Sequence, residues 1–205
     1  MEMINLRSLY KNSILVLAFI LLTMFLVACK DKSNEVQIEP EFNYAIQDFE
    51  YTNQDGETVS LEDLKGKYWV ADFVFTKCET VCIPMTSNMV KLQQMAKDKD
   101  LDVHFVSFSV DPKNDTPEVL KQYADDYGAD LSNWDFLTGY SQDHIESFAA
   151  KSFKALVSKV DGYDQVNHAV TFYIVSPDGE AIHAFSGTKL EEMENIIEHL
   201  DFYIN

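Results

Sequence analysis

The feature that most constrains the fold is an apolar segment that leads directly into two cysteines. Residues 68–75 (YWVADFVF) contain a single charged residue, Asp72, and such a run is typical of a strand buried on both faces. Cys78 and Cys82 follow it, and apolar residues then recur every three or four positions as far as residue 98. That period predicts a helix. The chain therefore places a thiol pair between a central strand and the helix that follows it.

The remaining apolar segments alternate between strand and helix patterns. A weakly alternating stretch over 42–59, with a turn at 53–56, predicts an N-terminal hairpin. Further strands are expected at 101–110, 134–137, 171–175 and 181–185, and further helices at 60–64, 116–127, 142–153 and 190–202. This order predicts an α/β fold with a central sheet covered by helices. It is similar to the thioredoxin-like fold with an N-terminal β-hairpin extension and an inserted segment, at about 128–168, before the last hairpin.

The first 28 residues have the marks of an export signal. Arg7 and Lys11 precede an apolar run over 14–28 that is shorter than the roughly 20 residues of a membrane-spanning helix. The run ends in Leu-Val-Ala-Cys at 26–29, which resembles the lipobox of bacterial lipoproteins and implies cleavage before Cys29 and acylation of that residue. An uncleaved signal anchor is the alternative. Both place the domain on the extracytoplasmic face of the cell membrane, held by a tether.

The mature part is expected to be one acidic domain. We predict a signal peptide over 1–28, a flexible tether over 29–41 and a single domain over 42–205. The whole chain has a net charge of −18, and loss of the signal peptide removes two basic residues and one acidic residue. Such a charge disfavours nucleic acid as a partner. The only arginine, Arg7, lies in the signal peptide.

The thiol pair is better placed for chemistry than for packing. Ligands bind at the carboxyl ends of strands in open α/β sheets, and backbone N–H groups at a helix start stabilise a thiolate. Residues four apart on a helix share a face with Cβ atoms roughly 5–6 Å apart, which allows either a disulfide or a shared metal ion. A purely structural disulfide is the alternative, although so short a loop gains little chain-entropy stabilisation.

A third ligand is sought among five histidines. In a thioredoxin-like fold, the loop that enters the strand over 170–174 lies against the start of the redox helix. His168 stands just before that strand, so its position in the chain predicts closeness to the cysteines. The other histidines are expected to be ordinary surface or structural residues: His104, His144, His183 and His199.

Three stretches resemble the Sco family, also called SenC. They are 73–82 (FVFTKCETVC), 109–112 (SVDP) and 166–168 (VNH). Residues 133–139 (NWDFLTG) agree with it, and the resemblance covers roughly residues 42–200. It is strongest to the lipoprotein type of Gram-positive bacilli. The family usually has a proline directly after the second cysteine, whereas this chain has Ile83 there and Pro84 one position later.

The resemblance implies a copper protein. Family members bind Cu(I) or Cu(II) through the two cysteines and the histidine, here Cys78, Cys82 and His168, and two thiolates with one imidazole suit that metal. The implied role is assembly of the dinuclear copper site in subunit II of cytochrome c oxidase, with a thiol reductant protein as a second partner. Asp111 could lie near the metal, but an aspartate there more often caps a turn.

Three other functions use the same residues. In a membrane-anchored thiol-disulfide oxidoreductase, Cys78 and Cys82 are a catalytic redox pair that reduces the copper-site cysteines of subunit II. The Cys-x-x-x-Cys spacing, and the absence of a proline before the strand over 170–174, disfavour a general oxidoreductase. A peroxiredoxin needs an arginine beside its cysteine, and the mature domain has none. A lipoprotein with a structural disulfide predicts that His168 has no role in metal binding.

Overall fold

The computed structural model describes residues 37–78, 82–160, 162–163 and 165–205. The predicted signal peptide, the acylated Cys29 and most of the tether lie outside these residues. In the described part of the chain, none of the helices is both long enough and apolar enough to cross a membrane.

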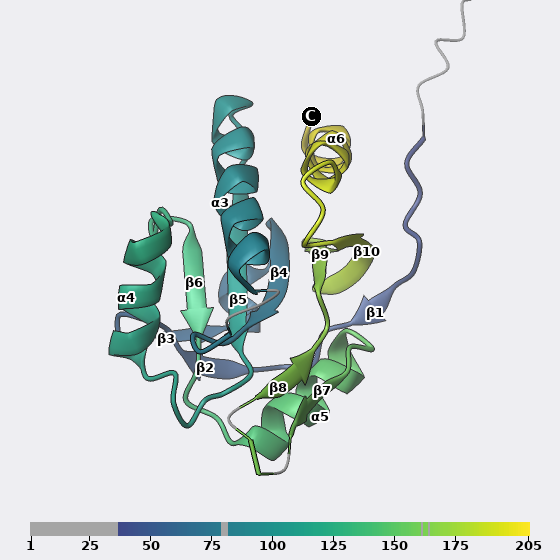
Figure 1. The fold of residues 1–205 in the computed structure, drawn as a ribbon. Helices are drawn as coiled ribbons and strands as arrows, with labels where there is room; N and C mark the ends of the chain where they lie inside the picture. Colours follow the sequence, from purple (N-terminus) through teal and green to yellow (C-terminus); the bar gives the residue numbers. More distant parts are fainter. Residues whose placement is uncertain (1–36, 79–81, 161, 164) are drawn as a thin grey trace, which may run out of the picture. The chain divides into compact units, whose positions relative to one another are not determined.

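A six-stranded mixed sheet forms the centre of the domain (Figure 1). Its strands, in spatial order, are β1 (Tyr44–Ala45), β10 (Glu180–Ser186), β9 (Thr171–Val175), β4 (Tyr68–Val74), β5 (Val103–Ser109) and β6 (Trp134–Leu137). The last three are parallel, whereas β9 runs antiparallel to β4. Because Ala71 is paired with Tyr173, β9 begins beside the carboxyl end of β4. The chain before β9 and the chain after β4 therefore meet at one edge.

Helices and hairpins cover the two faces of this sheet. One face packs on α3 (Cys82–Asp98), α4 (Pro117–Tyr127) and α6 (Glu192–Ile204). The other packs on α5 (Gln142–Ser152), α2 (Leu61–Leu64) and two hairpins, β2 (Glu50–Thr52) with β3 (Thr58–Ser60), and β7 (Val157–Lys159) with β8 (Val166–His168). Along β4, Trp69, Ala71 and Phe73 join one cluster while Val70 and Val74 join the other. Both faces of β4 are thus buried, as its sequence predicts.

The helix ends follow local chemistry. Thr116 accepts a hydrogen bond from the backbone N–H of Val119, and Pro117 occupies the first turn of α4. Proline is favoured there because its missing N–H has no helical partner to lose. Ser60 and Asp63 form a reciprocal capping box at α2, in which each side chain bonds a backbone N–H group that has no partner within the helix. These caps explain why the predicted helix starts agree with the structure.

The structure confirms an α/β fold and differs from the prediction in two places. The predicted turn at 53–56 joins β2 to β3, but the paired part of the hairpin is shorter than predicted, because β1 pairs with β10 instead. The inserted segment also contains the unpredicted hairpin β7–β8. Its strands are three residues long and rich in polar residues, so they carry no clear apolar alternation.

Candidate metal centre

Cys78 lies in the loop that connects β4 to α3, at the carboxyl edge of the parallel strands. Its backbone N–H donates a hydrogen bond of 3.3 Å to the carbonyl of Phe75, which turns the chain at the end of β4. The Cys78 residue is only 9% exposed and belongs to the apolar cluster on the α5 face. Cys82 begins α3, but its side chain and residues 79–81 lie outside the described part of the chain, so the pairing of the two thiols stays a prediction.

A buried carboxylate fixes the start of the cysteine loop. Asp115 is fully buried and accepts hydrogen bonds from the hydroxyl and backbone N–H of Thr76, at 2.7 and 3.3 Å. Its second oxygen accepts one of 2.6 Å from Ser109 at the end of β5. Burial raises the pKa of Asp115 above its usual value, against the opposing effect of these hydrogen bonds. The loop that carries Cys78 is therefore tied to the neighbouring strand.

His168 is brought to the same edge by β8. Its ring lies edge-on to the ring of Phe75, with the centroids 5.8 Å apart. Phe75 stands three residues before Cys78 in the chain. The Nδ1 atom of His168 is 3.0 Å from the carbonyl oxygen of Ala169, and a carbonyl can only accept, so Nδ1 carries the proton. In the neutral ring the lone pair is then on Nε2, and burial lowers the pKa of His168, which keeps it neutral. Metal-binding histidines are commonly oriented by such a bond to a backbone carbonyl.

An ion pair links the hairpin of His168 to the loop after β5. Lys159 of β7 donates a hydrogen bond of 2.8 Å to Asp111, and Asn114 donates one of 2.7 Å to the other carboxylate oxygen. Burial would raise the pKa of Asp111, but these two bonds and the charge of Lys159 outweigh it and lower the pKa. Both oxygens of Asp111 thus have protein partners, in keeping with a structural role.

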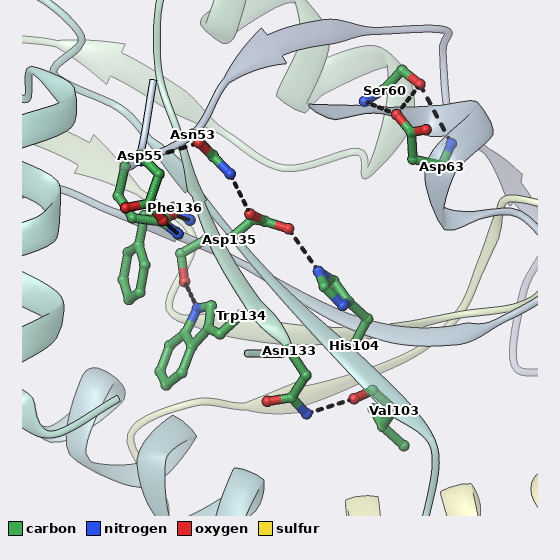
Figure 2. A network of polar contacts seen from close by, with 12 residues as sticks. Asn53, Asp55, Ser60, Asp63, Val103, His104, Asn133, Trp134, Asp135 and Phe136 are labelled. Carbon is green, nitrogen blue, oxygen red and sulfur yellow. Dashed lines mark hydrogen bonds and ion pairs between the residues drawn. The ribbon is translucent and has the colours of Figure 1, made fainter. Parts of the chain in front are cut away.

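Two of the other histidines are held by contacts with side chains of the domain core and of β6. His104 on β5 lies 2.7 Å from Asp135 on β6. Asp135 in turn accepts a hydrogen bond of 2.8 Å from Asn53, next to β2 (Figure 2). His144 contacts the hydroxyl of Tyr51 at 2.7 Å. Within the described residues, which exclude the Cys82 side chain, no group of three or more His, Cys, Asp or Glu side chains is arranged to hold a metal ion.

Sequence reasoning missed the polar residues that support the site. Asp115 and Lys159 act through hydrogen bonds between segments far apart in the chain, and neither lies in a motif that would reveal those contacts. The sequence could have revealed one other buried carboxylate. Asp72 is the one charged residue in the apolar strand β4. It is fully buried and accepts a hydrogen bond of 2.6 Å from Ser107.

Similarity to known proteins agrees with this geometry. The chain is 50% identical over 177 residues to the SCO1 protein homolog of Bacillus subtilis, with 86% of this chain and 90% of that protein covered. The structure resembles a SCO1/SenC family lipoprotein of Bacillus anthracis, with a TM-score of 0.76, 47% identity, and 78% and 95% of the two chains covered. It likewise resembles BsSco, a cytochrome c oxidase assembly protein with a disulfide switch, with a TM-score of 0.75, 50% identity, and 81% and 96% covered.

A more distant structure contains the metal itself. Copper-bound ScoI of Bradyrhizobium japonicum matches with a TM-score of 0.64 and 27% identity, over 78% of this chain and 99% of that one. The SCO1/SenC family model matches residues 39–205, which include the whole described domain except its first two residues. This chain therefore belongs to the SCO1/SenC family.

Proposed function

We propose that this chain is a copper-binding assembly factor for cytochrome c oxidase. The observation that carries the proposal is the position of His168, whose hairpin brings a neutral imidazole against the loop of Cys78. Its relatives support the same role, because BsSco belongs to a family of cytochrome c oxidase assembly proteins and the ScoI relative contains copper. Cys78, Cys82 and His168 are the proposed ligands.

The chemistry of these three side chains fits copper. Soft thiolates select Cu(I), and two thiolates with one imidazole also hold Cu(II). Zinc accepts the same ligands but favours four. In His168, the bond from Nδ1 to Ala169 places the lone pair of the neutral ring on Nε2, the nitrogen that we propose as the ligand. In this proposal copper is the ion that the protein delivers, and it is not a catalytic cofactor.

The proposed recipient is the dinuclear copper site in subunit II of cytochrome c oxidase. A lipid anchor at Cys29 would hold the domain on the extracytoplasmic face of the membrane, and the relative from Bacillus anthracis is described as a lipoprotein. A thiol reductant protein is the second proposed partner, because the cysteines must be reduced to bind Cu(I). The acidic charge of the chain disfavours nucleic acid as a partner.

Copper titration of the reduced chain tests the ligand set. The native protein should bind one copper ion at the thiol site, with a thiolate-to-copper absorption band, and its melting temperature should rise with copper excess. His168→Ala should weaken this binding at least tenfold and change the band. His144→Ala is the matched control. His144 contacts Tyr51, so its replacement should leave the titration unchanged. A His168→Ala protein that binds like the native one would exclude the proposed ligand set.

A thiol-disulfide oxidoreductase is the second candidate function. It is favoured by the disulfide switch described for BsSco and by the position of Cys78 in the loop that leads from β4 to α3. The proposed reaction transfers two electrons and two protons from the reduced Cys78–Cys82 pair to a partner disulfide, through a mixed disulfide. Turnover of a disulfide substrate with a thiol reductant measures it. Fast turnover that persists in the His168→Ala variant would assign the pair to reduction instead of copper delivery.

A further inference from the structure

A pair of imidazoles lies outside the cysteine site, where β10 packs against α6. The ring centroids of His183 and His199 are 4.6 Å apart, with an angle of 79° between the ring planes. His183 is 1% exposed, and His199 is half-buried on α6. The function proposed above uses neither residue.

A β-bulge turns His183 toward α6. The register between β10 and β9 shifts between Ala181 and His183. Ala181 and Ala184 pack in the cluster on the α5 face, whereas Ile182 packs in the cluster on the α6 face. Strict alternation would point His183 back to the α5 face, yet its ring contacts His199 and Tyr203 of α6. Bulges re-aim side chains and are frequent at functional sites.

Hydrogen bonding determines which nitrogen of His183 has a lone pair. The hydroxyl of Tyr203 donates its one proton to the carbonyl of Ile38 at 3.0 Å. It must therefore accept from Nε2 of His183, which lies 2.8 Å away. The proton of the neutral ring is then on Nε2 and the lone pair on Nδ1. That Nδ1 atom is buried and has no hydrogen-bond partner among the residues that the structure describes.

His199 offers a second nitrogen by the same reasoning. Its Nδ1 lies 2.8 Å from the carbonyl oxygen of Asn195, one turn earlier in α6, and must be the donor. The lone pair of the neutral ring is therefore on Nε2. Burial and the neighbouring His199 lower the pKa of His183, and the carboxylate of Glu41 opposes this by raising it. The buried ring is thus neutral at neutral pH, as metal binding requires.

We propose that His183 and His199 form a second metal site, free of thiolates, which binds a borderline divalent cation such as Cu(II) between β10 and α6. Two imidazoles that share an ion at metal–nitrogen distances of about 2.0–2.1 Å have ring centroids at most roughly 6 Å apart, so the observed separation is within reach after a small rotation of the half-buried His199 ring. Water completes the coordination. Among divalent first-row metals, nitrogen sites bind Cu(II) most tightly.

The site is best tested in a full-length chain that lacks the first site. The background variant, Cys78→Ser/Cys82→Ser/His168→Ala, is purified in detergent and titrated with Cu²⁺, with bound copper followed by electron paramagnetic resonance. One Cu²⁺ per chain is expected, with superhyperfine splitting from two imidazole nitrogens. Because the thiol ligands are absent from this background, the result does not depend on the function proposed above.

Two conservative changes separate binding from folding. His183→Gln keeps a donor near Nε2 for Tyr203, and His199→Asn keeps a donor near Nδ1 for the helix carbonyl, so both should keep the circular dichroism spectrum of the background. Each should weaken Cu²⁺ binding at least tenfold and remove the two-nitrogen signal. His104→Gln is the matched control and should change neither.

Three outcomes would overturn the proposal. The background variant binds no Cu²⁺, or it binds Cu²⁺ equally well with His199→Asn, or His104→Gln removes the signal to the same extent. His199→Asn decides the question if His183→Gln fails to fold, because His199 is half-buried on the outer helix and its replacement removes little packing.

Discussion

The buried Asp72 should make the domain less stable as the pH rises. Asp72 lies on β4 among apolar side chains, and burial raises its pKa from 3.8 to about 7, against a small opposing effect of the bond from Ser107. Its Oδ2 atom has no hydrogen-bond partner among the described residues. The folded state therefore holds a proton that the unfolded chain has already released between these two pH values.

The sign and size of the effect follow from proton linkage. A carboxyl whose folded pKa is raised favours the folded state below the unfolded pKa, and this stabilisation is lost as the pH rises through the folded pKa. With values of 3.8 and about 7, the loss between pH 5 and pH 8 is about 2.5 kcal/mol, out of a total of about 4 kcal/mol from below the unfolded pKa to above the folded pKa. That is a large part of the stability of a typical domain.

Asp72→Asn isolates this contribution. An amide cannot ionise, so its own cost, about 1–3 kcal/mol for an unsatisfied N–H, is the same at every pH. Urea unfolding of the metal-free, reduced protein at pH 5, 6, 7 and 8 should show the variant gaining about 2.5 kcal/mol relative to the native protein across that range. The control Asp201→Asn removes an exposed carboxyl whose pKa is lowered by Lys99, and its curve should stay parallel to that of the native protein. Parallel curves for Asp72→Asn as well would refute the reasoning.

Three further substitutions test polar contacts and packing in the domain. Asp115→Ala leaves the hydroxyl of Thr76 without its acceptor, so chemical denaturation should show a loss of about 1–3 kcal/mol and copper titration a weaker site. Lys159→Met leaves the carboxylate of Asp111 buried, with Asn114 as its remaining partner from this pair. We expect the free energy of unfolding to fall by about 2–4 kcal/mol at pH 7 and by less at acid pH. Equal losses at both pH values would argue against the ion pair. Gly187→Ala places a Cβ atom 2.8 Å from a phenylalanine ring, so thermal melting should show a cost of about 1–3 kcal/mol, whereas an unchanged melting temperature would mean that the ring moves freely.

The central strands and helices could be predicted because their signals are local. The apolar run of β4 and the Thr116–Pro117 start of α4 are each contained in a few neighbouring residues, and the structure places both where expected. β1 could not be predicted to pair with β10, because an edge strand of two residues has no pattern of its own. The hairpin β7–β8 was missed because its three-residue strands are rich in polar residues and show no clear apolar alternation.

The site was predictable only where topology supplied the argument. The closeness of His168 to the cysteine loop followed from its place before β9, and the structure brings its ring to Phe75. The ion pair of Lys159 with Asp111 depends on the path of the inserted segment, which the sequence does not specify. The bulge that turns His183 toward α6 is a single-residue shift in register, and no residue type in β10 predicts it.

The proposed ligands lie on two segments that should open at different rates: His168 on the hairpin β7–β8, and Cys78 in the loop after the central strand β4. A two-stranded sheet on its own is only marginally stable, and β7–β8 is bonded to no strand of the central sheet in the described chain, whereas β4 is at the centre of that sheet. Amide protons of β8 should therefore exchange with solvent through local opening, long before those of β4. Each opening carries the imidazole away from the thiol loop. The lifetime of the hairpin, and not that of the whole domain, would then set how quickly a bound ion can be passed on.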